Sequence, residues 1–188
     1  GAFAAQRELA AALTPHAERD GALADAATDV PMTGGARKHT LLVEVLQLLA
    51  EAAVREEPQL GSQMNAVILS HDDLAGALSF QIARKLGDAE LGAMTVREVA
   101  LSAFAADPAI VAAAEADLKA VQERDPAIRS LLQPFMYFKG FQALQAWRVA
   151  HWLWTQDRDT LAFHFQSRIS ELFQLDIHPA ARIGSGVF

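Results

Sequence analysis

The sequence predicts a mainly helical chain whose pattern changes near residue 174. Apolar residues recur every three or four positions from residue 41 to residue 172, the spacing of helices with a buried face. Capping residues and prolines divide this stretch into several helices. Beyond residue 174 that spacing is lost, and Pro179 blocks a further helix.

The first part of the chain is predicted as a helix over residues 3–13 followed by a linker over residues 27–37, which contains the pair Gly34-Gly35. Thr40 is predicted to cap the next helix. The apolar face of that helix would hold Leu41, Val45, Leu48, Leu49 and Ala52. Pro58 suits the first position of a further helix.

The middle of the chain has two further helix starts. Ser70-His71-Asp72 opens a helix that Gly87 ends, with an apolar row at a spacing of four residues: Leu74, Leu78, Ile82 and Leu86. Thr95 and Glu98 fit a capping box. The helix behind it would bury Val96, Val99, Ala100 and Ala103.

Two Asp-Pro pairs, Asp107-Pro108 and Asp125-Pro126, each resemble a helix N-cap followed by a first-turn proline. One amphipathic helix lies between them, with Ile110, Ala113, Ala114, Asp117, Leu118 and Val121 in its spacing. Residues 135–155 predict a helix buried on more than one side, with Phe138, Phe141, Leu144, Trp147, His151 and Trp154 in its stripe. After a turn at residues 157–159, Leu161, Phe165, Ile169 and Leu172 mark a last helix.

The end of the chain carries two aliphatic residues six positions apart, Ile177 and Ile183, and Gly184 follows the second. This is the repeat of a left-handed parallel β-helix, in which each six-residue side points one aliphatic side chain inward. We therefore predict three parts: an N-terminal extension over 1–40, a helical domain over 41–174, and the incomplete first coil of a β-helix over 175–188.

Composition excludes several classes of protein. Apolar residues make up 52% and charged residues 21%, as in a globular protein, and no apolar run is long enough to span a membrane. The net charge is −7 without a Lys/Arg stripe, which argues against a nucleic-acid partner. The absence of cysteine suits a cytoplasmic protein. The histidines do not show a metal-binding spacing, so we expect no metal site.

Several segments together resemble the bacterial serine O-acetyltransferases of cysteine biosynthesis, from about residue 45 to residue 188. The strongest run extends from Lys139 to Gly184. The segments are Ser70 to Leu74 with Ala77 to Phe80, Arg97 to Val99 with Ala105 to Pro108, Arg124 to Ala127, Tyr137 to Ala146, Arg148 to Trp154, and Asp176 to Gly184. Residues 1–40 resemble no family.

The resemblance implies transfer of the acetyl group of acetyl-CoA to L-serine, with acetyl-CoA as co-substrate and no covalently bound cofactor. It also implies feedback inhibition by L-cysteine. The family assembles as hexamers, dimers of trimers, in which helical domains join the trimers. Its members can bind O-acetylserine sulfhydrylase through a C-terminal tail, which is absent here.

Two site residues are implied by the resemblance. Asp176 would orient the general-base His, and Asp125 would hold the ammonium group of serine or cysteine. The His itself is expected beyond Phe188, with most of the acetyl-CoA groove, so this chain alone is expected to be inactive. From local sequence alone, Asp125 is an ordinary helix cap and Asp176 an ordinary turn cap.

The remaining candidates have structural interpretations. His178 is expected at the surface or the domain junction, His151 as a satisfied core histidine, and His71 as a helper in capping its helix. The three tryptophans are expected as core and interface anchors. Two alternative functions stay open: a non-catalytic helical oligomerisation module, and a hexapeptide-repeat acyltransferase with another acceptor.

Overall fold

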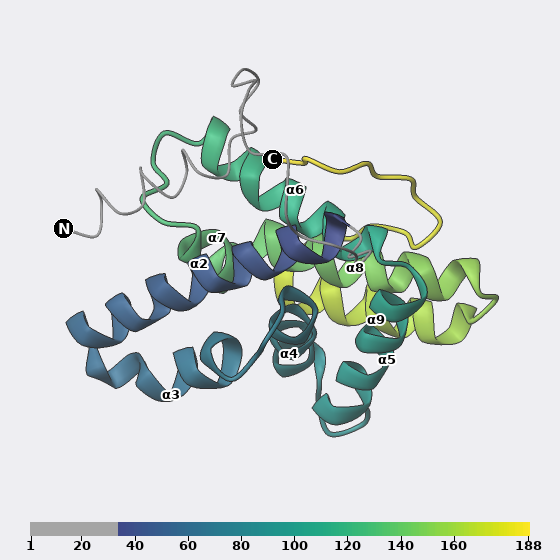
Figure 1. The fold of residues 1–188 in the computed structure, drawn as a ribbon. Helices are drawn as coiled ribbons and strands as arrows, with labels where there is room; N and C mark the ends of the chain where they lie inside the picture. The colour runs from purple at the N-terminus through teal and green to yellow at the C-terminus, as the bar shows by residue number, and fades with distance from the viewer. Residues whose placement is uncertain (1–33) are drawn as a thin grey trace, which may run out of the picture.

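The helix pair α8 and α9 lies beside the helix pair α4 and α5, and α2 and α6 complete the packing around them (Figure 1). The computed structural model describes residues 34–188, and the side chains of residues 41–188. The helix predicted over residues 3–13 lies outside the described residues. The prediction of a mainly helical chain is confirmed, and residues 34–188 contain no strand.

The helices follow one another through short connections. They are α2 (Gly34–Glu56), the 3₁₀ turn η1 (Pro58–Leu60), α3 (Gly61–Met64), the π-helical turn η2 (Asn65–Leu69), α4 (Leu74–Leu86), α5 (Ala93–Ala106), α6 (Ala109–Arg124), α7 (Leu132–Tyr137), α8 (Lys139–Thr155) and α9 (Asp159–Phe173). Pro58 occupies the first position of η1, as predicted. The residues with described side chains form two parts: the helical body, residues 41–173, and the C-terminal segment, residues 174–188.

Helix α2 corrects three predictions. It begins at Gly34, so the linker predicted over residues 27–37 is wrong from Gly34 onward, and Thr40 lies inside the helix instead of capping it. Its buried face is also rotated from the predicted one. Leu42, Leu46 and Ala50 are buried with Val45, whereas two predicted core residues, Leu41 and Leu48, are 46% and 57% exposed. Leu41 and Leu48 lie on the same face of α2 as the exposed Glu44, Glu51 and Arg55, which recur at helical spacing and mark the solvent side of the helix.

Helix α4 is the best-predicted element. Its row of Leu74, Leu78, Ile82 and Leu86 is fully buried. Asp73 caps its start by accepting a 2.7 Å hydrogen bond from the Gly76 N–H. Gly87 ends it, as predicted, and only glycine fits there, because a Cβ would lie 2.6 Å from the Ala93 backbone at the start of α5.

Helix α5 begins two residues before the predicted capping box. Gly92 is its N-cap residue, and no side chain caps it, so the role predicted for Thr95 and Glu98 is wrong. The predicted buried residues Val96, Val99, Ala100 and Ala103 are nevertheless all buried. The local capping signal was therefore misleading, while the apolar spacing was correct.

Helices α8 and α9 form the centre of the core. Every residue from Phe141 to Ala150 is buried, which confirms a helix covered on more than one side. The single helix predicted over residues 135–155 is wrong in one respect, because the chain is extended at Phe138, which separates α7 from α8 and is exposed. Asp157, with φ of 56°, forms the turn into α9, and Phe165 and Ile169 of α9 are buried. Gln174 then adopts the left-handed conformation (φ 60°, ψ 32°), which ends α9 and starts the C-terminal segment.

Among the described residues, no single helix is long and apolar enough to cross a membrane. Helices α5 and α6 reach that length and composition only together, with a bend of 97° between them.

Candidate functional site

The candidate site lies where the C-terminal segment returns over α8 and ends beside α6 (Figure 1). Five side chains from these two helices bond to its backbone, and one of them, Arg124 of α6, donates to the Gly186 carbonyl at 3.0 Å. Trp147 Nε1 donates to the His178 carbonyl (3.1 Å), and His151 Nδ1 lies 2.6 Å from the Pro179 carbonyl. Arg148 Nη2 donates to the Gly184 carbonyl (2.8 Å), and Asp117 Oδ1 accepts from the Val187 N–H (2.9 Å).

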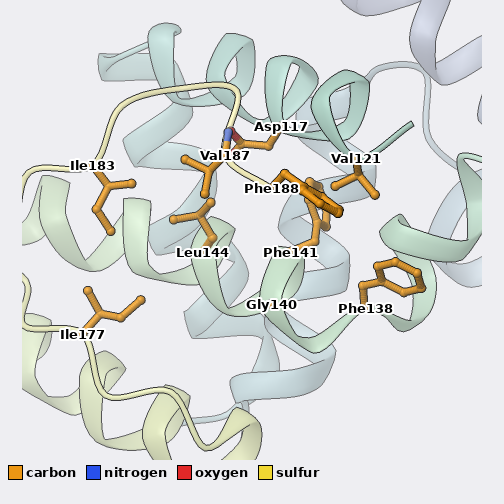
Figure 2. A pocket seen from close by; sticks show the side chains of 10 residues that line it. All are labelled: Asp117, Val121, Phe138, Gly140, Phe141, Leu144, Ile177, Ile183, Val187 and Phe188. Atoms are coloured by element: carbon orange, nitrogen blue, oxygen red, sulfur yellow. The ribbon is translucent and has the colours of Figure 1, made fainter. Parts of the chain in front are cut away.

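A pocket of about 370 Å³ lies beneath this segment, between α6 and α8 (Figure 2). Its walls are almost entirely apolar, with Asp117 as the one carboxylate among them. Ile177 and Ile183 point into it, and both are partly buried against the core. The two aliphatic residues at the six-residue spacing therefore do face inward, although the β-helix coil predicted over 175–188 stays a prediction.

Asp125 lies at the C-terminal end of α6 and is half-buried. Its Oδ1 accepts a 2.9 Å bond from the Ala127 N–H, and its carbonyl accepts from the Ile128 N–H. These bonds close a turn instead of starting a helix, since α7 begins only at Leu132. The predicted helix cap is wrong for this reason. Oδ2 of Asp125 makes no hydrogen bond or ion pair with residues 41–188.

Asp107 provides a local comparison for Asp125. Its Oδ1 accepts a 3.0 Å bond from the Ala109 N–H, and its carbonyl accepts from the Ile110 N–H. Here the chain continues directly into α6, which begins at Ala109 with Pro108 as its N-cap residue, so Asp107 lies one position before the predicted cap and bonds to the first residue of the helix. The two Asp-Pro pairs share one local geometry, and only their surroundings can give them different functions.

Asp176 lies in the C-terminal segment, three residues after α9 ends, and is exposed. Gln166 of α9 donates a 2.7 Å bond from Nε2 to Asp176 Oδ1. No hydrogen bond or ion pair in the described part of the chain links Asp176 to Asp125. The structure thus leaves both implied site residues with a free carboxylate oxygen and does not bring them into contact.

Two histidines at the junction, His178 and His151, have structural partners. His178 is exposed at the junction, as predicted, and its Nδ1 accepts from the Ala180 N–H (3.0 Å). His151 is satisfied by the Pro179 carbonyl and stacks on Trp147, which is 1% exposed. The core position predicted for Trp147 is confirmed, and His151 is satisfied as predicted but is half-buried and not a core residue.

His71 differs from its prediction. It is buried, and its Nε2 lies 3.0 Å from the Ala66 carbonyl, so it does not cap α4; Asp73 does. Burial holds the pKa of His71 below its ordinary value, and the bond to Ala66 opposes that shift. Among residues with described side chains, no cluster of His, Asp or Glu could hold a metal ion.

A buried polar cluster at the junction was not identified from sequence. Asp117 is 1% exposed and Arg148 7%, and they form an ion pair of 2.7 Å, with Gln145 donating to the same Asp117 oxygen at 2.9 Å. The signal was present in the sequence, because Asp117 falls on an otherwise apolar helix face and Arg148 within the most apolar stretch.

A family profile described as "Serine acetyltransferase, N-terminal" matches residues 43–146. The chain belongs to the serine acetyltransferase family. The serine acetyltransferase of Escherichia coli (strain K12) is 48% identical over 131 residues, which are 70% of this chain and 48% of that protein. The chain therefore spans about half the length of the curated relatives it matches.

Solved structures of serine acetyltransferases have the same fold over the shared part. The enzyme of Vibrio cholerae O1 biovar El Tor superposes with a TM-score of 0.78 at 47% identity, over 80% of this chain and 58% of that one. Soybean serine acetyltransferase complexed with serine gives a TM-score of 0.76 at 42% identity, over 79% and 61% of the two chains. A serine acetyltransferase in complex with cysteine gives a TM-score of 0.76 at 40% identity, over 77% of this chain and 60% of that one. A serine acetyltransferase in complex with CoA gives a TM-score of 0.76 at 41% identity, over 78% of this chain and 63% of that one.

Proposed function

We propose that this chain is the N-terminal part of a serine O-acetyltransferase, which converts acetyl-CoA and L-serine to O-acetyl-L-serine and CoA in the first step of cysteine biosynthesis. The observation that carries the proposal is the 48% identity to a serine acetyltransferase over most of this chain. The solved relatives bound to serine, CoA and cysteine support the same two substrates and the same inhibitor.

The chemistry needs a general base, because a serine hydroxyl is a weak nucleophile at neutral pH. The base removes the hydroxyl proton while the oxygen attacks the thioester carbonyl. The carbon–sulfur bond then breaks, and the CoA thiolate leaves and takes up a proton. We propose that the base is a His beyond Phe188 and that Asp176 orients it and stabilises its charged form.

Asp125 is proposed to bind the ammonium group of serine, or of cysteine in the inhibited enzyme. Its half-buried position and its free Oδ2 support this role, because a carboxylate oxygen without a protein partner can accept a charge-assisted bond from an ammonium group. Its Oδ1 remains occupied by the turn, which would hold the side chain in place.

The rest of the assignment follows the family. We propose that residues 175–188 begin the left-handed β-helix, that the acetyl-CoA groove lies mostly beyond them, and that the protein is a cytoplasmic hexamer. Its other protein partner would be O-acetylserine sulfhydrylase, bound through a C-terminal tail. A polypeptide limited to residues 1–188 would then assemble without catalysing acetyl transfer.

The test measures CoA release from acetyl-CoA by the complete gene product, with and without L-serine. We expect serine-dependent release, and none from a polypeptide of residues 1–188. Release that needs another acceptor, such as an amino sugar, would favour a different hexapeptide-repeat acyltransferase. If no acceptor supports CoA release, the remaining hypothesis is a non-catalytic helical oligomerisation module. The native mass of a polypeptide of residues 1–188 would then test whether it assembles.

Asp125 and Asp107 form a matched pair for the site. Asp125→Asn should raise the KM for L-serine by about 10- to 100-fold, the range for loss of one charge-assisted bond. Asp107→Asn has the same local geometry and should leave that KM unchanged. Equal effects of the two substitutions would remove Asp125 from the substrate site.

A further inference from the structure

The buried ion pair between Asp117 of α6 and Arg148 of α8 also binds the backbone of the C-terminal segment. Asp117 Oδ2 accepts from Arg148, while Asp117 Oδ1 accepts from the Val187 N–H at 2.9 Å. Arg148 uses the same Nη2 for Asp117 and for the Gly184 carbonyl, at 2.8 Å. Figure 2 shows Asp117 directly beside Val187 at the edge of the pocket. The pair therefore joins three separate parts of the chain.

Stability is a poor explanation for this pair. Removing two charges from water costs several kcal/mol each, roughly, and apolar residues of similar volume often serve a fold as well or better. Helices α6 and α8 are already in contact, and each contributes fully buried apolar side chains to the core, such as Leu118 and Val149. What an apolar pair could not provide is the fixed hydrogen bonds to Gly184 and Val187, which set the position of the segment.

Helix α6 makes a second contact with the C-terminal segment, through Arg124, the residue immediately before Asp125. Arg124 Nη1 donates to the Gly186 carbonyl at 3.0 Å. Since Asp117 and Arg124 are seven positions apart, they lie on the same face of α6, and that face ends at Asp125. The helix that carries Asp125 is thus bonded at two points to the segment that carries Asp176.

We propose that Asp117 and Arg148 are a positioning pair for acetyl transfer. By fixing Gly184 and Val187 against α6 and α8, the pair sets the place of Asp125 relative to the segment that contains Asp176 and to the chain that follows it. This inference rests on the proposed function and adds two residues that touch neither substrate.

The test uses the complete gene product with Asp117→Leu and Arg148→Met combined, which removes both buried charges together and leaves neither unpaired. We expect a folded protein in which the amides of residues 184–188 exchange faster with solvent. The KM for L-serine should rise and kcat/KM for L-serine should fall about 10- to 100-fold, the effect of a displacement of about 1 Å at a reacting centre. A loss of folded protein alone would lower apparent kcat without changing KM.

Asp88 and Arg168 provide the matched control. Arg168 of α9 bonds to Asp88 at 3.1 Å and to the Leu86 carbonyl, so this ion pair joins α9 to the end of α4 and does not touch the C-terminal segment. Asp88→Asn combined with Arg168→Met should lower the melting temperature and leave the KM for L-serine unchanged. Arg124→Ala removes only the exposed bond to Gly186 and should change KM in the same direction as the positioning-pair variant, by less.

The outcomes separate this inference from the proposed function. A parent protein without serine-dependent CoA release would overturn the proposed function itself. An active parent whose double variant frees residues 184–188 but keeps the parental KM and kcat would overturn the positioning pair alone. Should the double variant fail to fold, Arg124→Ala decides, and an unchanged KM for L-serine in that variant would sink the inference.

Discussion

The helical body and the C-terminal segment are held by different forces. The body buries a continuous apolar core, and most of its side-chain hydrogen bonds join residues close in sequence, such as the cap from Asp73 to Gly76. The segment adds one buried residue, Pro179, and packs the partly buried Ile177, Ala181 and Ile183 against that core, while side chains of α6 and α8 bond to its backbone. The position of the segment is therefore encoded largely in the helices on which it lies.

Truncating one aliphatic side chain in each region tests this difference most strongly. Leu78→Ala removes a fully buried side chain from α4 and should cost about 2–5 kcal/mol of unfolding free energy, because the rigid core cannot fill the cavity. Ile177→Ala removes a half-buried side chain from the segment and should cost about 1 kcal/mol or less. Denaturant unfolding measures both, and similar costs would contradict the comparison.

Trp147→Phe tests the polar docking of the segment. The substitution keeps a large aromatic ring in the core but removes the donor to the His178 carbonyl, so a loss of about 1–2 kcal/mol is expected. Trp152→Phe on the same helix is the control, since the Trp152 ring nitrogen makes no hydrogen bond with residues 41–188. Limited proteolysis should cleave the segment faster in the Trp147 variant only. Equal cleavage in both would show that ring packing holds the segment.

Asp73→Ala tests a local polar contact of the body. Removing an N-cap typically costs about 1 kcal/mol, and the effect should stay within the body, with the segment's amide exchange unchanged. Thr95→Ala is the control, because Thr95 lies inside α5 and caps nothing. A greater loss of thermal stability in the Thr95 variant would restore the capping box that the structure rejects.

The smallest expected effect is a pH dependence of the body. The pKa of His71 is lowered in the folded protein by burial, so the unfolded chain binds a proton first as the pH falls below about 6.5. Folding stability should therefore decrease as the pH falls from 7 to 5. His71→Gln should flatten this decrease in melting curves recorded across that range. An unchanged slope would assign the pH dependence to other groups.

Regular spacing predicted the helices that have one distinct apolar face. The row Leu74, Leu78, Ile82 and Leu86 is buried as predicted, and so are Phe165 and Ile169. The prediction was wrong for α2, because Leu48 lies on the face that also carries the exposed Glu44 and Glu51, whereas Leu42 and Leu46 lie on the buried face. The polar residues of a helix identify its buried face together with the apolar ones.

The two Asp-Pro pairs predicted the hydrogen bonds of their Asp side chains better than they predicted the secondary structure of the residues that follow. Asp107 and Asp125 both accept from the N–H two residues on, as their common Asp-Pro pattern indicates. The chain continues as a helix after Asp107 and as a turn after Asp125. After Pro126 the chain reaches the buried Leu131 and Leu132 at the start of α7, a path that the Asp-Pro pattern does not encode.

The amino-acid sequence by itself determined that this chain is mainly helical, where most of its helices lie, and which family it belongs to, because periodicity, caps and family motifs are local in the chain. Only the tertiary structure decided that Asp117 and Arg148, 31 positions apart, meet beneath the C-terminal segment and bond to its backbone. A buried charge on an apolar face signals that a partner must exist. Which residue that partner is depends on how the helices pack, and no local pattern contains that information.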